Sequence, residues 1–224
     1  AAIVLFFAAI LIPQLLLTAG GQRALIPPHF LRGVGWLAGL RVRREGQPKR
    51  GKLLLVANHT SWLDILALAG VSRSAFVAQG GLAGHGFLKW LCDQNDTLFI
   101  ARDRRGTVAG QVAQVRGALA RRRMTIFPEG TTSDGTALLP FKSALLSAVE
   151  GSSDVTVQPV ALDYRAAPAI AWHGEEPGGA NVLRILARIR PIRVTARFLE
   201  PLSGSELADR KSMAAAAQQR IAGA

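Results

Sequence analysis

From Lys52 onward the sequence alternates short apolar runs with segments of helical periodicity, and this alternation limits the fold more than any other feature. Leu53–Ala57 has no polar residue, as expected of a strand that is buried on both faces. Val108–Arg123 repeats its apolar residues at helical spacing, and Ile192–Leu199 alternates apolar with polar residues like a half-exposed strand. Strands and helices in this order are typical of an α/β domain. We therefore predict a central, mixed and mostly parallel sheet flanked by helices over residues 53–224.

Shorter patterns of the same kind predict the remaining elements of this domain. Short apolar runs indicate strands at Ala75–Ala78, Thr97–Ala101, Met124–Phe127 and Val155–Leu162. Helical patterns indicate helices at Ile65–Gly70 and Phe141–Glu150, and a final helix after the capping-box residues Ser203 and Glu206.

The beginning of the chain differs from the rest because it is a nearly uninterrupted apolar run. Ala1–Ala19 contains one strongly polar side chain, Gln14, and Pro13 interrupts the run. A helix over most of this run falls a little short of the ~30 Å hydrocarbon core of a bilayer. We therefore predict a membrane-associated helical segment over residues 1–40, with a buried core helix as the alternative. Pro27-Pro28 favours two short helices joined by a bend over one long helix.

Basic residues follow the apolar run closely, and residues 41–52 are interpreted as a basic linker. The whole chain has 27 Lys and Arg against 15 Asp and Glu, a net charge of +12, which favours an anionic partner. An apolar segment followed by basic residues indicates the cytoplasmic face of a membrane, with a merely solvated charged face as the alternative. The basic residues here are Arg23, Arg32, Arg41, Arg43, Arg44, Lys49, Arg50 and Lys52.

Other classes of protein are disfavoured by what the sequence lacks. Cys92 is the single cysteine, which excludes an intrachain disulfide framework and a multi-cysteine zinc site. The four histidines are far apart in sequence, so we expect no metal site. The sequence has no recognised nucleic-acid-binding motif, so we expect no nucleic acid partner despite the positive charge.

The first chemical motif directly follows the strand expected at Leu53–Ala57. It is Asn58-His59-Thr60-Ser61-Trp62-Leu63-Asp64, and strand ends are where α/β folds place their chemistry. His59 and Asp64 can meet if His59 precedes a helix that Thr60 or Ser61 caps. Asp64 would then accept the Nδ1 hydrogen of His59 and leave Nε2 free as a general base. A loop histidine beside an ordinary capping box is the alternative.

The second motif follows the strand expected at Met124–Phe127. It reads Phe127-Pro128-Glu129-Gly130-Thr131-Thr132-Ser133-Asp134-Gly135. A loop of such small residues can present backbone N–H groups and hydroxyls to a polar or anionic ligand. An ordinary turn at Asp134-Gly135 is the alternative.

Together the two motifs resemble those of the glycerolipid acyltransferase family, to which the bacterial 1-acylglycerol-3-phosphate acyltransferases belong. The family's N-H-x4-D and F-P-E-G-T blocks occur here in the right order. Weaker similarities to its other blocks occur at Leu98–Arg102, Val157–Ala161, Pro140–Ala144 and Phe198–Leu202. The resemblance covers about Leu53 to Leu202 and implies an α/β acyltransferase.

The resemblance also implies roles for individual residues. His59 corresponds to the base that deprotonates the acceptor hydroxyl, and Asp64 to its orienting partner. Arg102 corresponds to an arginine that contacts the anionic head of the acceptor. Glu129, Gly130, Thr131 and Thr132 lie in the block that binds the acceptor.

Two differences from the family pattern concern the acceptor. Thr132 stands where many members that form phosphatidic acid carry Arg, and Ala101 replaces an acidic residue. The stretch from Phe127 onward is also similar to the lyso-ornithine lipid acyltransferases of bacteria, so both acceptors remain open.

The sequence thus predicts a membrane-associated O-acyltransferase on the cytoplasmic face of a bacterial inner membrane. The acyl donor would be a thioester of acyl carrier protein or coenzyme A, and no cofactor is expected. Lysophosphatidic acid is the first acceptor and lyso-ornithine lipid the second. The alternative from another class is a non-catalytic protein that binds anionic lipids.

Overall fold

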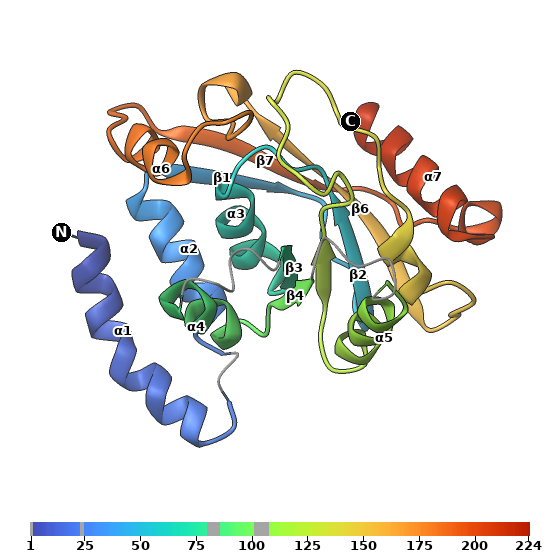
Figure 1. Ribbon diagram of the computed structural model, residues 1–224, viewed down its shortest axis with the longest axis horizontal. Helices are drawn as coiled ribbons and strands as arrows, with labels where there is room; N and C mark the ends of the chain where they lie inside the picture. The colour runs from blue at the N-terminus through green and yellow to red at the C-terminus, as the bar shows by residue number, and fades with distance from the viewer. Residues whose placement is uncertain (1, 23–24, 80–85, 101–107) are drawn as a thin grey trace.

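The structure is a computed structural model that describes residues 2–22, 25–79, 86–100 and 108–224. Its centre is a 7-stranded sheet with the order β1-β7-β6-β2-β5-β3-β4 (Figure 1). Neighbouring strands are parallel except for the antiparallel pair β6 and β7, so the predicted mixed, mostly parallel sheet is confirmed. The strands are β1 (Leu40–Glu45), β2 (Lys52–Ala57), β3 (Ala75–Gln79), β4 (Leu98–Ile100), β5 (Met124–Ile126), β6 (Val155–Tyr164) and β7 (Ile192–Phe198).

Helices cover both faces of the sheet. Helices α2, α3 and α6 pack on one face, and α5 and α7 pack on the other. The helices are α1 (Ala2–Ala19), α2 (Pro27–Leu37), α3 (Leu63–Ser72), α4 (Gly86–Gln94), α5 (Val108–Leu119), α6 (Gly178–Leu186) and α7 (Arg210–Ala222).

Strand β2 is buried from both sides, which explains its continuous apolar sequence. Leu53, Leu55 and Ala57 face the core beneath α3, whereas Leu54 and Val56 face the core beneath α5 and α7. All five residues are 0% exposed. The loop that leaves the end of β2 therefore starts from a strand that is held by the core on both of its faces.

Part of the expected basic linker is a strand. Residues 40–45 form β1, which pairs in parallel with β7 at the edge of the sheet. Leu40 is buried against the core, whereas Arg41, Arg43 and Arg44 are exposed. An edge strand can carry many arginines because one side of it is solvated. The division of the chain into domains stays a prediction, but residues 41–45 belong to the sheet.

Two other local expectations differ from the structure. The helix expected over Phe141–Glu150 is only a 3-10 helix, Ala144–Ala148. The backbone N–H groups of Phe141 and Lys142 donate to Gln218 and Pro128 instead of to helical partners.

The capping box at Ser203 and Glu206 is present, but it opens a 3-10 helix, Gly204–Leu207. The final helix α7 begins later, where the Asp209 side chain accepts hydrogen bonds from the Lys211 and Ser212 N–H groups.

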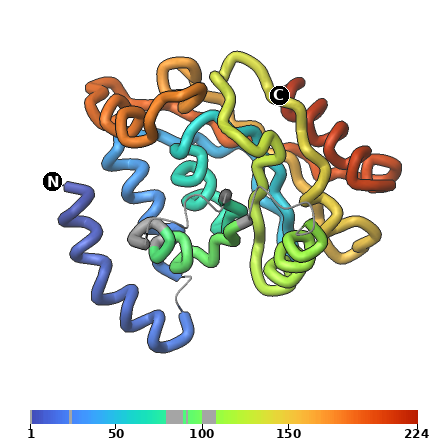
Figure 2. The backbone as a smooth tube through the Cα atoms, viewed as in Figure 1, coloured from blue at the N-terminus to red at the C-terminus, as the bar shows by residue number. Residues whose placement is uncertain are grey.

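The N-terminal helices form a bent pair, as predicted. Helix α1 lies along the outside of the molecule beside α2 (Figure 2). Phe6 and Phe7 contact Phe30 of α2, and a Cβ at Gly33 would lie 2.4 Å from the Phe6 ring. Gly33 therefore permits the close approach of the two helices. Helix α1 is long and apolar enough to cross a membrane by length and composition, and 6% of it is buried.

Candidate active site

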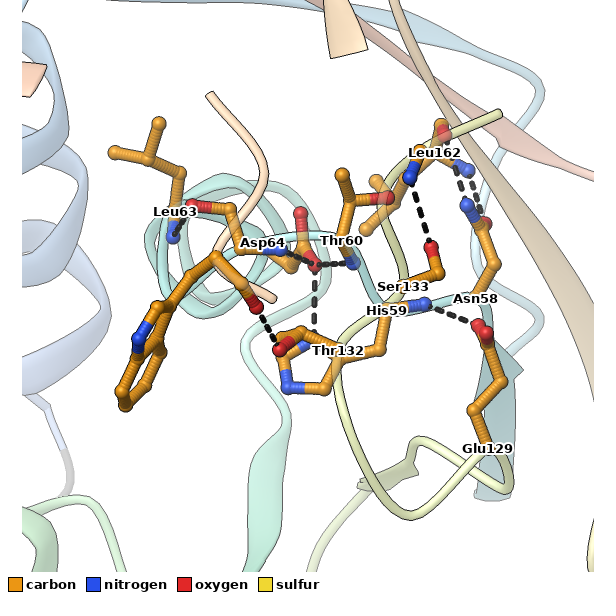
Figure 3. A network of polar contacts seen from close by, with 12 residues as sticks. Asn58, His59, Thr60, Leu63, Asp64, Glu129, Thr132, Ser133 and Leu162 are labelled. Carbon is orange, nitrogen blue, oxygen red and sulfur yellow. Dashed lines mark hydrogen bonds and ion pairs between the residues drawn. The ribbon is translucent and has the colours of Figure 1, made fainter. Parts of the chain in front are cut away.

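Three neighbouring parallel strands bring the predicted motifs to one edge of the sheet. The loop after β2 carries His59, the loop after β5 carries Glu129, and β6 ends at Tyr164. The carboxyl ends of parallel strands lie at the same edge, which is where α/β folds bind ligands. Figure 3 shows the resulting network of polar contacts around His59 and Asp64.

His59 and Asp64 contact each other directly. The His59 Nδ1 atom lies 2.8 Å from Asp64 Oδ2. Asp64 is in the first turn of α3, whereas His59 precedes that helix. The expected capping is different, because Trp62 and not Thr60 or Ser61 is the N-cap residue of α3, although Ser61 Oγ accepts the Leu63 N–H at 3.4 Å. Instead the Asp64 carboxylate reaches back and accepts the Thr60 and Ser61 N–H groups at 2.7 and 2.9 Å.

Asp64 is completely buried, and Tyr164 supplies a further donor. The Tyr164 hydroxyl donates to Asp64 Oδ1 at 2.6 Å, and Asp64 is 0% exposed. Burial is the largest cause that raises the pKa of Tyr164 well above its usual range, followed by the charge of Asp64. Tyr164 therefore keeps its proton and remains a donor. A buried carboxylate needs such donors to offset the loss of its hydration.

This arrangement determines which His59 nitrogen can act as a base. Asp64 Oδ2 already accepts two backbone N–H groups, so it is an acceptor toward the imidazole as well. The Nδ1 atom of neutral His59 therefore carries the hydrogen, and Nε2 carries the lone pair. The His59 side chain is 18% exposed, so this base is partly open to solvent.

An aromatic side chain holds the other side of the His59 ring. The Phe127 ring stacks on it with centroids 4.2 Å apart and planes 18° from parallel. Phe127 in turn stacks on Phe76, whose side chain is buried in β3. The imidazole is therefore fixed in plane by Phe127 and along its edge by Asp64.

Glu129 lies behind the His59 backbone. Its Oε1 atom accepts the His59 N–H at 2.6 Å, and its Oε2 atom accepts the Leu139 N–H at 3.0 Å. The residue is 2% exposed, and this burial raises the pKa of its carboxyl, although the two backbone donors oppose the shift. Glu129 ties the two motifs together, because its contact to His59 joins the loop after β5 to the loop after β2.

Gly130 needs the conformation that glycine allows. Its φ is +71°, and a Cβ at this position would lie 2.8 Å from the Lys142 Nζ atom. The side chain of Lys142 therefore passes close over the backbone of Gly130. This ammonium group places a positive charge beside the predicted acceptor loop.

The remaining predicted site residues have different positions. Thr131 is exposed, whereas the Thr132 hydroxyl donates to the Trp172 carbonyl. The Ser133 N–H donates to the His59 carbonyl at 2.8 Å, so the loop after β5 is hydrogen-bonded to the loop that carries His59. Arg102 lies outside the described residues. The acceptor-binding roles of all these residues stay predictions.

Sequence reasoning missed the roles of three residues in this site. Tyr164 is the only tyrosine of the chain and lies two residues after the strand expected at Val155–Leu162, which is the one signal that points to it. The Asn58 carboxamide exchanges hydrogen bonds of 3.0 and 2.7 Å with the Leu162 backbone, which fastens the start of the motif to β6. Phe127 was part of a motif, but its contact with His59 requires the folded sheet.

Comparisons with known proteins agree with this arrangement. The model of the acyltransferase family matches residues 39–163, which is more than half of the chain. A lyso-ornithine lipid O-acyltransferase of Brucella abortus is 35% identical over 219 residues, covering 90% of this chain and 82% of that protein. The chain therefore belongs to the acyltransferase family, and the predicted family membership is confirmed.

Two further relatives have names that differ from that of the Brucella protein. A 1-acyl-sn-glycerol-3-phosphate acyltransferase of Neisseria gonorrhoeae is 37% identical over 128 residues, covering 56% of this chain and 49% of that protein. The crystal structure of the 1-acyl-sn-glycerophosphate acyltransferase of Thermotoga maritima superimposes with a TM-score of 0.59 at 21% identity. It covers 98% of this chain and 93% of the other, and it shows the shared fold.

Proposed function

We propose that this chain is a membrane-associated O-acyltransferase that transfers a fatty acyl group from an acyl thioester to the free hydroxyl of a lysolipid. The observation that carries the proposal is the contact between His59 and the buried, fully hydrogen-bonded Asp64 at the end of β2. Membership in the acyltransferase family supports the reaction class.

In the proposed reaction His59 acts as a general base and Asp64 as its positioning residue. His59 Nε2 takes the proton of the acceptor hydroxyl while the hydroxyl oxygen attacks the thioester carbonyl carbon. The tetrahedral intermediate collapses to an ester and breaks the C–S bond. The departing thiolate takes the proton back from His59. No covalent acyl-enzyme and no cofactor are needed, since the thioester itself supplies the activated acyl group.

For the acceptor we place lyso-ornithine lipid before lysophosphatidic acid, which reverses the order that the sequence suggested. Three relatives align over 89–90% of this chain, and all three are named lyso-ornithine lipid O-acyltransferases. The Neisseria relative, named for 1-acyl-sn-glycerol-3-phosphate, aligns over 56%. Thr132 in place of Arg also supports an acceptor other than a phosphomonoester. Lysophosphatidic acid stays the second candidate.

The proposed acceptor loop includes Glu129, Gly130, Thr131 and Thr132, with Arg102 as a further contact. The geometry supports distinct tasks within this group. Glu129 holds the His59 backbone, whereas Thr131 is exposed and free to meet a head group. Lys142 adds a cation next to Gly130 that can pair with the carboxylate of an ornithine head or with a phosphate.

Membrane association is proposed from α1. Its side chains Val4, Leu5, Ile12 and Leu16 are 68–70% exposed, and such a helix is stable when lipid covers it. The basic residues that follow support the cytoplasmic face as the location. The acyl donor would reach the site from that side as a thioester of acyl carrier protein or coenzyme A.

The decisive experiment offers the purified chain one acyl thioester together with lyso-ornithine lipid and lysophosphatidic acid in mixed micelles. Mass spectrometry of the products identifies the acceptor. We expect ornithine lipid as the main product. We expect His59→Ala to lose about 10²–10⁴-fold in kcat, because a general base contributes that much. The matched control is His173→Ala, which removes an exposed histidine outside the network.

Each other outcome has a definite meaning. Phosphatidic acid as the main product would favour the second acceptor. Retained activity of His59→Ala would contradict the role of His59. If the native chain forms neither product but binds anionic vesicles, the result would contradict the acyltransferase proposal and favour the non-catalytic lipid-binding alternative.

A further inference from the structure

Helix α6 has an unusual distribution of side chains. A helix on the surface of a soluble protein normally buries its apolar stripe and exposes its polar side chains. In α6 the buried residues are Asn181 and Ile185, whereas Leu183 and Leu186 are 70% and 42% exposed. Ile189, just after the helix, is 100% exposed. The outer face of this segment is therefore apolar.

The inner face of α6 is fixed by polar contacts, so the apolar face cannot simply rotate inward. Asn181 Oδ1 accepts the Trp62 indole N–H at 3.0 Å, and its Nδ2 group donates to the Ala171 carbonyl at 3.1 Å. Arg184 donates to Glu176 and to the carbonyl of Ala169. The leucines on the other side point outward because these contacts hold the helix.

A cluster of arginines adjoins the apolar residues. Arg165, Arg188, Arg190 and Arg193 line a cavity of about 380 Å³. No carboxylate is among the described residues that line it, and none of those residues accepts a hydrogen bond from the buried Nε atom of Arg188. Clustered positive charges repel one another in water unless an anion lies between them.

The end of α2 continues the same surface. Ile192 donates its N–H to the Gly39 carbonyl at 2.9 Å, which joins the segment after α6 to the segment after α2. Trp36, at the end of α2, is 59% exposed, and the Arg41 guanidinium lies 5.0 Å from its ring centroid. In the sheet Arg41 is the register partner of Arg193, so two exposed like charges lie beside each other.

We propose that this surface docks on the face of a bilayer that contains anionic phospholipids. We define it as the α6 surface, and it inserts aliphatic side chains between the lipids while its arginines contact the phosphates. An exposed tryptophan beside arginines is typical of the membrane interface. The α6 surface consists of Trp36, Leu183, Leu186, Ile189, Arg41, Arg188, Arg190 and Arg193.

The proposal rests on the proposed membrane association but adds a second contact besides α1. It also brings the membrane close to the site. Trp62, which holds Asn181 of α6, follows His59 by three positions, and the Trp172 N–H donates to the Thr60 carbonyl at 3.0 Å. Docking of α6 would therefore place the wall of the active site next to the lipid surface, where a lysolipid acceptor resides.

A fluorescent label tests the α6 surface in the full chain, where α1 remains present. Ile189→Cys in a Cys92→Ser background is labelled with the environment-sensitive dye NBD and mixed with vesicles of phosphatidylethanolamine and phosphatidylglycerol. The matched control carries the label at Ser205→Cys, an exposed position near α7, which lies at the opposite end of the molecule from α6 (Figure 1). We expect a blue shift and quenching by doxyl lipids for the label at 189 but not at 205.

Charge dependence is tested with the same label. Arg188→Gln with Arg190→Gln should raise the concentration of phosphatidylglycerol vesicles required for the response by about thirtyfold, since each basic residue near such a surface contributes about 1 kcal/mol. Vesicles of phosphatidylcholine alone should give a smaller shift in the unsubstituted protein.

Three outcomes would overturn the proposal. The first is an unshifted label at 189 on protein that floats with the vesicles. The second is a label that shifts with protein concentration in the absence of lipid, because the surface would then bind a second copy of the chain. The third is an equal response with and without the two arginines. Acyl transfer is measured on the same samples. An active protein with an unshifted label would contradict membrane docking by the α6 surface and leave the proposed function intact.

Discussion

The segments that follow β2 and β5 each contain a buried carboxylate, Asp64 in the first turn of α3 and Glu129 in the loop after β5, but the two carboxylates accept hydrogen bonds from different kinds of donor. Asp64 contacts a reactive side chain, since one of its oxygens lies 2.8 Å from His59 Nδ1. Glu129 contacts only backbone, through the N–H groups of His59 and Leu139. Asp64 therefore affects the orientation and tautomer of the imidazole, whereas Glu129 affects where the loop lies.

This difference shows that the role of a buried carboxylate beside a histidine depends on its hydrogen-bond donors and not on its burial alone. Asp64 has four donors, which are the His59 imidazole, two backbone N–H groups and the Tyr164 hydroxyl. Glu129 has fewer donors, and burial raises the pKa of its carboxyl. Four substitutions test this contrast.

Asp64→Asn should have the largest effect. An amide cannot accept from all four donors: at the place of Oδ2 its NH₂ group would meet the Thr60 and Ser61 N–H groups and reverse the His59 tautomer, and at the place of Oδ1 it would face the Tyr164 hydroxyl. We expect kcat to fall by about 10²–10⁴-fold and the melting temperature to drop, because the change leaves buried donors without acceptors. Turnover with saturating lysolipid and thermal unfolding measure the two effects. Asp154→Asn, at an exposed carboxylate, is the control, and near-native turnover of Asp64→Asn would contradict the role of Asp64.

Glu129→Gln should have a smaller effect on turnover. Glutamine retains one carbonyl oxygen for the His59 or Leu139 N–H but turns its NH₂ group toward the other. The loop shifts while the His59 to Asp64 contact remains, so we expect about a tenfold loss of kcat with an unchanged pH profile of kcat. The exposed Glu175→Gln is the control. An altered pH profile would mean that Glu129 exchanges protons with the reacting groups.

The same variant should change the pH dependence of stability. Because burial raises the pKa of Glu129 above its usual range near 4.5, the folded state holds its proton more tightly than the unfolded state. The stabilisation that this residue gives is complete below pH 4.5 and is lost as pH rises through the raised pKa. Urea unfolding as a function of pH should therefore show the wild type losing stability relative to Glu129→Gln over that range. Parallel curves would contradict the raised pKa.

Tyr164→Phe should reduce activity less than either change of a carboxylate. It removes one hydrogen bond to Asp64 and keeps the ring in the core. A hydrogen bond to a charged group contributes about 1.5–3 kcal/mol, so we expect about that loss in the free energy of unfolding and a several-fold loss of kcat. Chemical denaturation and initial rates measure both. If kcat and stability are unchanged, Asp64 does not depend on the tyrosine.

Glu176→Gln should have the smallest effect, because the carboxylate lies outside both loops. Its bond to Arg184, with Asn181 as the second cause, lowers the pKa of Glu176 from 4.5 to about 2. The stabilisation by the charged form is present above pH 4.5 and is lost as pH falls toward 2. The melting temperatures of the wild type and Glu176→Gln should therefore converge over this range while activity at neutral pH is unchanged. A constant difference between them would contradict the pair.

The sequence predicted those parts of the fold that local pattern determines. The apolar run of β2 and the helical periodicity of α5 were recognised because burial acts on the residues of the element itself. Strand β1 was missed because Arg41, Arg43 and Arg44 dominate its sequence, and its strand character depends on pairing with β7. Helix α6 was missed because it has only nine residues and begins with Gly178 and Gly179, which have low helix propensity.

Within the candidate site, too, the sequence predicted the contact that local spacing determines and missed those that depend on the folded sheet. His59 and Asp64 are five positions apart, so their contact follows from one loop and the first turn of a helix. Tyr164 reaches Asp64 across 100 positions of sequence, and no local spacing encodes that contact. Phe127 belonged to a motif, but only the neighbouring order of β2 and β5 brings its ring onto His59.

The pairing of β1 with β7 also orders events during synthesis. Glu45 of β1 and Arg197 of β7 are bonded although they are 152 positions apart in the sequence. Helices α1 and α2 leave the ribosome long before the only strand that pairs with β1 in the described part of the chain. On the proposed membrane association, the first two helices would meet lipid while β1 is still unpaired, and the sheet would be completed afterwards.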